Sequence, residues 1–437
     1  MKLPALSTVL LALAFSAAPA FAQRLSPLAP RPDWRELEPF QGTITRSEFT
    51  HLLETVYAPG GASRGVIEVK EDAAIIRSTL NPAGEWRLRF APENSSVKVP
   101  PRYWRTPMQL GPAPADRPLE GVKIAIDPGH LGGEWAKVEE RWFQIGESKP
   151  VAEGEMTLRV ATLLAPQLRA LGAEVTLVRD RLGPTTPERP ESLRSAALAE
   201  LALQGVVNPR ETYDPAQIED PERGQTVQWQ TELLFYRISE IRHRAKVVNE
   251  QLRPDLVLCL HFNAEAWGGN AKNPLFVPRN HLHVLVNGSY DAGELRFDDQ
   301  RHDLLRKLLN RSYREELIAS ERVASALALA TQLPPYEYTT ANARRTGTGP
   351  YVWTRNLLAN RLYHAPVVFL EPYVMNNEEV WARIQAGDYE GERFFAGRMR
   401  KSLFREYADA VAKGLAEHYR AARAVPSAEA AIQAVPK

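Results

Sequence analysis

Three short apolar runs in this chain each end in a side chain that can bind a metal ion or move a proton. His130 ends the segment VKIAIDPGH, His261 directly follows LVLCL, and Glu371 directly follows VVFL. Short β-branched runs bounded by Pro, Gly or polar residues are typical of buried strands. Because the carboxyl ends of parallel strands meet at one edge of a sheet, we expect the two imidazoles and the carboxylate to lie close together.

Two histidines and one carboxylate are a common ligand set for catalytic zinc, which leaves a fourth position open for water. The run AEGEM, at the start of the first predicted helix, offers two carboxylates, Glu153 and Glu155. Residues two apart on a helix do not share a face, so only one of them can bind the ion. For either residue alone, a carboxylate that complements the helix dipole is the simpler interpretation.

Glu371 and Asn263 are the other polar residues that follow predicted strands closely. A carboxylate after an apolar strand is costly to bury unless it is paired or functional. Beside a metal and its water, Glu371 can act as a general base and then as an acid toward a leaving amine. Asn263 either orients His261, contacts substrate or caps the turn. His281 and His283, at an apolar strand, are interpreted as ordinary strand residues.

The elements that must position these residues alternate between strands and helices. Apolar residues at helical spacing over 156–171 predict an amphipathic helix, and a strand is expected at 175–178. A strand–helix–strand order implies parallel pairing with a right-handed crossover. The other expected elements are helices at 234–248, 321–333 and 395–419 and strands at 256–260, 282–286 and 367–370. The predicted fold class is α/β, a mostly parallel twisted sheet with helices on both faces.

Shifts in composition divide the chain into units. A charged start, an apolar core and a small-residue cleavage site before Gln23 have the layout of a secretory signal peptide. The expected units are a signal peptide at 1–22, a linker at 23–33, a small α+β module of unknown role at 34–110, a catalytic domain at 119–420 with an insertion at about 184–231, and a disordered tail at 421–437.

The overall composition is that of a globular, exported protein. The 437 residues are 44% hydrophobic and 24% charged, with a formal net charge of +1, so no basic excess favours nucleic acid. The apolar run of the leader is too short for a normal membrane span, which predicts a periplasmic or extracellular protein with no span after cleavage. The single cysteine, Cys259, lies in a predicted buried strand and is expected to pack in the core.

These pieces together resemble the zinc-dependent N-acetylmuramoyl-L-alanine amidases, which cleave the amide between muramic acid and the stem peptide of bacterial cell walls. The resemblance covers residues from about Leu119 to Tyr419, with the matching segments in the family's order. They are IDPGH ending at His130, a glutamate leading the first helix, Arg244 with Asn249, DLVLCLHFNA from Asp255 to Ala264, and VVFLE ending at Glu371 with Asn376 and Asn377 just beyond.

The resemblance implies one zinc ion per chain, bound by His130, by His261 and by the glutamate that opens the helix. In the family this glutamate stands five residues before the first core leucine of the helix. Leu158 therefore favours Glu153, with Glu155 as the alternative.

The resemblance also implies a catalytic residue and a substrate, whereas a partner for residues 34–110, which lie outside it, is a separate expectation. The family's catalytic glutamate falls on Glu371, and the substrate would be peptidoglycan. Residues 34–110 could contact a cell-wall or divisome partner.

The chain departs from the family's pattern in three places. The segment between His130 and Glu153 is longer than expected, the insertion at about 184–231 is unusual, and Pro372 and Tyr373 stand where the family often has Gly and Phe. Two other functions stay open. A zinc peptidase or carboxypeptidase of another lineage would use similar ligands, although the chain has no His-Glu-x-x-His motif. A non-catalytic cell-wall-binding protein would have an incomplete site.

Overall fold

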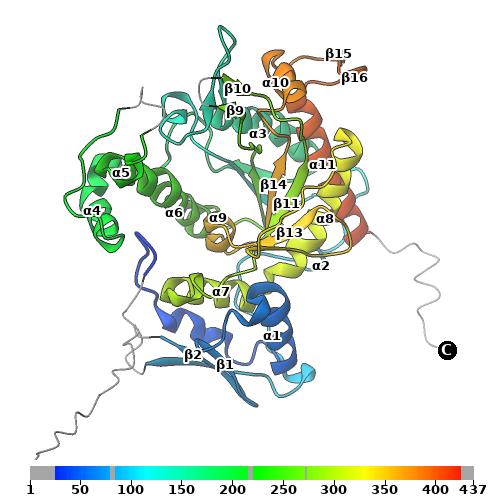
Figure 1. The fold of residues 1–437 in the computed structure, drawn as a ribbon. Coiled ribbons are helices and arrows are strands. Elements are labelled where there is room, and N and C mark those ends of the chain that lie inside the picture. Colours follow the sequence, from blue (N-terminus) through cyan, green and yellow to red (C-terminus); the bar gives the residue numbers. More distant parts are fainter. Residues whose placement is uncertain (1–24, 79–83, 215–219, 271–272, 425–437) are drawn as a thin grey trace, which may run out of the picture.

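The computed structural model describes residues 25–78, 84–214, 220–270 and 273–424 (Figure 1). The predicted signal peptide and most of the predicted tail lie outside these residues. Within the described part of the chain, no helix is both long and apolar enough to cross a membrane.

A seven-stranded sheet forms the centre of the molecule, with the strand order β12-β13-β11-β14-β8-β4-β7. Neighbouring strands are parallel except at β11–β14 and β12–β13. The strands are β4 (Lys123–Pro128), β7 (Glu174–Leu177), β8 (Leu256–Leu260), β11 (Leu282–Val286), β12 (Ala343–Arg345), β13 (Val352–Arg355) and β14 (Val367–Pro372). The structure confirms the predicted α/β class with a mostly parallel sheet.

Helices cover both faces of the sheet (Figure 1). On one face pack α3 (Glu153–Ala170), α8 (Ser312–Thr331) and α11 (Leu403–Ala422). On the other lie α6 (Glu240–Lys246) and α9 (Leu358–Leu362), over a core that includes Cys259. Strands buried on both faces must be apolar almost throughout, which is why LVLCL shows no alternation. Cys259 is a buried core residue, as predicted.

The middle of the sheet gathers the three predicted functional strands. β14, β8 and β4 are consecutive and parallel, so their carboxyl ends lie at one edge. β11 runs antiparallel to β14, and its first residues therefore reach the same edge. In the strand register His283 lies opposite Glu371. This arrangement brings a strand beginning, as well as strand ends, to the site.

The N-terminal part of the chain shares its core with the rest of the molecule. Its antiparallel sheet has the strands β1 (Ile67–Val69), β2 (Ala73–Arg77) and β3 (Glu85–Arg89), and Thr45 caps α1 (Arg46–Leu52) by accepting from the backbone N–H of Glu48. This module buries its apolar face against α7 (Asp298–Asn310), which lies directly above it in Figure 1.

Backbone pairing strengthens this junction. The N–H groups of Ser289 and Tyr290, which follow β11, donate to the carbonyls of Val56 and Tyr57 in the module at 2.8 and 2.7 Å. The module is thus fastened by main-chain hydrogen bonds as well as by apolar contact.

Several element boundaries differ from those expected from the sequence. The predicted helix 395–419 begins only at Leu403, because 393–400 forms a hairpin of β15 (Arg393–Phe395) and β16 (Arg398–Arg400). Its two turn residues, Ala396 and Gly397, both have positive φ, the requirement of a tight two-residue hairpin turn that glycine meets easily. The expected helices 321–333 and 156–171 also start earlier, as α8 and α3.

The remaining helices lie around this frame. The predicted helical stretch 234–248 begins in α5, continues through α6, and includes π-helical turns at 235–239 and 247–252. Inside the predicted insertion, α4 packs with α5 around a separate apolar cluster. The bounds of α4 and α5 are Arg194–Leu203 and Val227–Leu234. Two further short helices are α2 (Pro107–Leu110) and α10 (Glu378–Gln385).

The shared core at α7 can be tested by one substitution. Leu308 is fully buried between α7 and the module, so Leu308→Ala should lower the free energy of unfolding by about 2 to 5 kcal/mol. Chemical denaturation measures this. The control is Leu329→Ala, a helical leucine that is 72% exposed and should change stability by less than about 0.5 kcal/mol. Similar small effects at both positions would contradict a shared core.

Candidate metal centre

The turn after β4 places His130 at the sheet edge in an unusual backbone conformation. His130 has a φ of 60°, in the left-handed region that non-glycine residues rarely adopt. The preceding Gly129 cannot be replaced without movement, because a Cβ there would lie 2.2 Å from Cε1 of His261. The glycine of the DPGH segment therefore allows the backbone to approach the second histidine.

Arg244 on α6 holds this turn from the inside. Its Nη1 donates to Oδ1 of Asp127 at 2.9 Å and to the carbonyl of Pro128 at 2.8 Å, and its Nη2 donates to the carbonyl of His130 at 2.9 Å. Its Nε donates to Glu240 at 2.7 Å. Burial lowers the pKa of Arg244, but Asp127 and Glu240 outweigh it and raise that pKa above its ordinary value. The guanidinium stays charged and fixes the histidine's backbone.

A second buried arginine, Arg179, ties the turn to the start of α3. Its Nη2 donates to the carbonyls of Gly154 at 2.7 Å and Gly129 at 3.3 Å. Gly154 itself lies so close to the loop that a Cβ would be 2.3 Å from the backbone N of Gly132. This contact fixes the first turn of α3, which carries Glu153. The sequence analysis did not single out Arg179, which lies just beyond β7 and has no motif around it.

The structure brings His130, Glu153 and His261 together as a group that could hold a metal ion. One potential ligand atom from each residue lies within 4.8 Å of the others. Glu153 Oε2 is 3.2 Å from Nε2 of His130, and its Oε1 is 3.3 Å from Nδ1 of His261. Glu155 is exposed and is not part of the group, so the geometry favours Glu153 among the two candidates.

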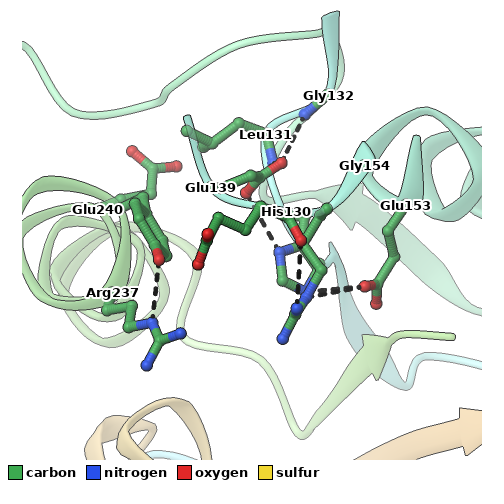
Figure 2. A network of polar contacts seen from close by, with 12 residues as sticks. His130, Leu131, Gly132, Glu139, Glu153, Gly154, Arg237 and Glu240 are labelled. Carbon is green, nitrogen blue, oxygen red and sulfur yellow. Dashed lines mark hydrogen bonds and ion pairs between the residues drawn. The ribbon is translucent and has the colours of Figure 1, made fainter. Parts of the chain in front are cut away.

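Two residues that the sequence analysis missed support this group. Glu139 Oε2 is 3.2 Å from Nδ1 of His130, on the opposite side of the ring from Glu153 (Figure 2). Glu139 also accepts from the backbone N–H groups of Leu131 and Gly132. A carboxylate on the second ring nitrogen fixes the tautomer and orientation of a metal-binding histidine. Arg141 Nε lies 3.3 Å from Glu153 Oε2.

Glu139 and Arg141 belong to the long segment that departs from the family's pattern. No periodicity or motif marks them, because they lie in the turn between a 3₁₀ turn (Gly133–Ala136) and the two-residue strand β5 (Trp142–Phe143). The only signal in the sequence is that charged residues lie between two expected ligands.

The second unusual segment packs against the first. The rings of Trp135 and Phe235 are in tilted contact with their centroids 5.0 Å apart, and Arg223 pairs with Glu140 at 3.2 Å. Glu140 stands between Glu139 and Arg141 in the chain. The helical insertion, which projects to the left in Figure 1, therefore supports the segment that contacts the ligand group.

The charges of the group are strongly coupled. Burial lowers the pKa of His130, but Glu153 and Glu139 outweigh it and raise that pKa to about 9. Burial raises the pKa of Glu153, yet His130 holds it well below its ordinary value. Burial lowers the pKa of His261. The carboxylate of Glu153 is the negative charge of the group, and the His130 imidazole has to release its proton before it can bind a metal ion.

Glu371 borders a polar cavity of about 230 Å³ beside this group. Burial and the nearby Glu153 raise the pKa of Glu371 to about 8. On its other side, Glu371 borders a second cavity of about 310 Å³ with a mostly apolar lining that includes Leu357, Leu358 and Phe369. One carboxyl group therefore faces both cavities. The cavities have in common His130, Arg141 and Glu371.

The remaining predicted residues take up places around the polar cavity. Asn263 lines it, and its Oδ1 also accepts from the N–H of Ala264 at 2.7 Å, so the geometry is compatible with substrate contact and with capping of the turn. His283 also lines the cavity, whereas His281 pairs with Glu265 at 3.0 Å. Neither of these histidines belongs to the ligand group.

Comparisons with known proteins give distant structural relatives only. No family model matches the chain, and no curated protein matches it. Among solved structures it is similar to the CwlD amidase of Clostridioides difficile in complex with the GerS lipoprotein (11% identity, 69% of this chain and 100% of that one, TM-score 0.37). It is also similar to the N-acetylmuramyl-L-alanine amidase Ami1 of Mycobacterium smegmatis (16%, 69% and 99%, 0.35) and to AmiC2 of Nostoc punctiforme (12%, 68% and 96%, 0.34). These matches are amidases of the kind that the sequence resembles.

The close approach at Gly129 predicts a loss of metal affinity. Gly129→Ala places a methyl group against the His261 ring and should displace it. If the group of His130, Glu153 and His261 holds a metal ion such as zinc, the affinity for that ion should fall by about tenfold or more, as changes to groups that orient ligands do. Competition with a chromogenic chelator measures this. Gly349→Ala, where a Cβ meets nothing within 4 Å, is the matched control. Equal zinc affinity in both variants would contradict the proposed packing constraint.

The raised pKa of Glu371 predicts a pH-dependent effect on stability in chelator-treated protein. Between about pH 4.5 and pH 8 the folded state keeps a proton that the unfolded carboxyl has lost. The stability linked to this proton is complete below pH 4.5 and is lost as pH rises through 8. The glutamine of Glu371→Gln does not titrate. The free energy of unfolding of this variant, relative to that of the wild type, should therefore rise from pH 5 to pH 8, by up to about 1.4 kcal/mol per pH unit.

Denaturant unfolding at pH 5, 6, 7 and 8 measures this difference. Glu155→Gln is the control, because Glu155 is an exposed glutamate in the first turn of α3. Its plot of unfolding free energy against pH should run parallel to that of the wild type. Parallel curves for Glu371→Gln as well would show that the carboxyl titrates normally.

Proposed function

We propose that this chain is an exported, zinc-dependent N-acetylmuramoyl-L-alanine amidase that hydrolyses the amide between muramic acid and L-alanine in peptidoglycan. The observation that carries the proposal is one group of possible metal ligands, His130, Glu153 and His261, beside two cavities that Glu371 also lines. The amidase resemblance of the sequence supports the choice of substrate. The proposed location is the periplasm or the extracellular space.

The donor set fits zinc. Two imidazole nitrogens and one carboxylate oxygen are the ligands of many catalytic zinc sites, which keep a fourth position open. The side chains of the two histidines are 16–18% exposed and that of Glu153 is 2% exposed; His130 and Glu153 line the polar cavity, and His130 and His261 line the apolar one. His130, Glu153 and His261 would hold one zinc ion per chain. When bound, zinc supplies a Lewis acid for the scissile carbonyl and for water.

The protein side of the reaction falls to Glu371. As a carboxylate it takes a proton from the attacking water while the water oxygen bonds to the carbonyl carbon. The C–N bond then breaks, and Glu371 passes the proton to the departing nitrogen of L-alanine. The products are a free muramoyl carboxylate and a peptide with a free amino terminus. A carboxyl group whose surroundings raise its pKa is suited to both halves of this transfer.

The supporting residues maintain this geometry. Glu139 orients the His130 ring, and Arg244 with Arg179 holds the turn beneath it. Asn263 lies at the cavity wall, where it can contact substrate. The proposed catalytic unit is 119–420, as the sequence indicates. We also propose that a cell-wall or divisome partner binds the module at 34–110, on the surface that faces away from α7.

Substitutions at the site separate metal binding from catalysis. Glu371→Ala should keep about one zinc per chain and lose at least 100-fold of its activity on purified peptidoglycan, because a positioned general acid–base contributes about 10²–10⁴-fold. His130→Ala and His261→Ala should lose bound zinc. Elemental analysis and mass spectrometry of the released peptides measure these results, and free N-terminal L-alanine identifies the amidase reaction.

Three results would overturn parts of the proposal. Cleavage within the stem peptide would indicate the alternative zinc peptidase or carboxypeptidase. Binding to the wall without any product would indicate the non-catalytic alternative. Full activity of Glu371→Ala would remove its catalytic role, and retained zinc in both histidine variants would remove the ligand assignment.

A further inference from the structure

Arg355, at the end of β13, is a charged residue for which the proposed reaction gives no role. Its side chain lines the polar cavity together with Glu371, and its Nη1 donates to the hydroxyl of Tyr338 at 3.2 Å. Among the residues that the structure describes, no carboxylate forms an ion pair with it. A guanidinium has five N–H donors, so most of its hydrogen-bonding capacity remains available toward the cavity.

His283 belongs to the same wall and lies buried against the hydroxyl of Tyr338. It is 2% exposed, and its Nε2 is 3.1 Å from the hydroxyl of Tyr338. Because that hydroxyl receives an N–H from Arg355, its own proton is free to be donated to Nε2. Nδ1 of His283 then carries the hydrogen, and within the described chain it has no hydrogen-bond partner. Burial keeps the ring neutral by lowering its pKa to about 3.

The wall is held rigidly against the sheet. Residues 334–336 pair with the start of β11, through Leu282 N to Pro334 O and Tyr336 N to Leu282 O, both at 3.0 Å. Alternate residues of an extended segment share a side, so Tyr336 and Tyr338 both face the strand's histidines. Their rings lie 5.0 and 5.4 Å from the ring of His283. The donors are therefore fixed in place before a ligand arrives.

The charge of the cavity indicates what such a wall would bind. Glu371 and Glu153 line the same cavity and repel an incoming anion, whereas Arg355 attracts one. Arg141, the other arginine of this cavity, is already paired with Glu153 at 3.3 Å. Arg355 is thus the one cation of the cavity, among the described residues, that has no carboxylate partner in the protein. An anionic ligand with two oxygens would match its planar fork.

We infer that Arg355, on the wall formed with Tyr336, Tyr338 and His283, binds a free carboxylate of the peptide part of the substrate. This inference rests on the proposed amidase function and specifies its substrate further. It makes Arg355 a specificity-determining residue that selects stem peptides with a free carboxylate over the same peptides in which that group is a carboxamide.

The experiment compares two muramoyl-peptide substrates that differ only in this group, the free acid and its carboxamide. The wild type should prefer the acid. Arg355→Met should lower kcat/KM for the acid by about 10- to 100-fold, mainly through KM, and should change kcat/KM for the carboxamide by less than about threefold. Arg355→Lys, which keeps the charge but not the fork, should recover part of the preference.

Arg345→Met is the matched control, because Arg345 is an exposed arginine on the neighbouring strand β12 and should retain the wild-type preference. Thermal unfolding checks that each variant folds. Equal losses on both substrates, or no loss on either, would overturn the inference while leaving the amidase function in place.

A binding measurement separates this inference from the reaction. Calorimetry with the folded Glu371→Gln variant, with and without Arg355→Met, gives the affinity for the same two fragments without turnover. Tighter binding of the acid that disappears with Arg355→Met supports the inference even if the wild-type protein cleaves neither substrate. Failure of the wild type to cleave either substrate would overturn the proposed function alone. Equal affinity for acid and carboxamide would overturn the inference.

Discussion

The buried ion pair between Arg244 and Asp127 is the interaction on which the rest of the site depends. Both side chains are almost fully buried, and the arginine also donates to Glu240 and to two carbonyls of the turn that carries His130. A charge in this position is tolerated only while all its partners stay in place. One guanidinium therefore joins α6, β4 and the turn into a single unit. Tyr363 adds a hydrogen bond to Asp127 from behind.

The parts of the site that lie on regular elements could be predicted from the sequence. Buried parallel strands have an unmistakable apolar pattern, so β8 and β11 have the expected bounds, and the positions of His261 and Glu371 follow from strand ends. The choice of Glu153 over Glu155 needed the start of α3, because that start determines which carboxylate faces the sheet edge.

Residues that act from irregular segments could not be predicted in the same way. Glu139 and Arg179 reach the site from turns without periodicity, and Arg355 reaches it from the last residue of β13, a short strand beside the edge strand β12. Their roles come from where the chain folds back, which is a long-range property. For the same reason, the sequence suggested a separate N-terminal module, whereas the structure gives it a core in common with α7.

The left-handed backbone of His130 has a consequence for how the site would respond to metal. Two protein groups contact this residue: Arg244 donates to the carbonyl of His130, and Glu139 contacts its ring. A ligand that is ordered by its own fold loses little freedom when an ion arrives. In zinc fingers, by contrast, the ion supplies the folding free energy. Under the proposed function, His130 would therefore meet a metal ion in a backbone conformation that Arg244 and Glu139 already support, and binding would not have to supply the folding free energy.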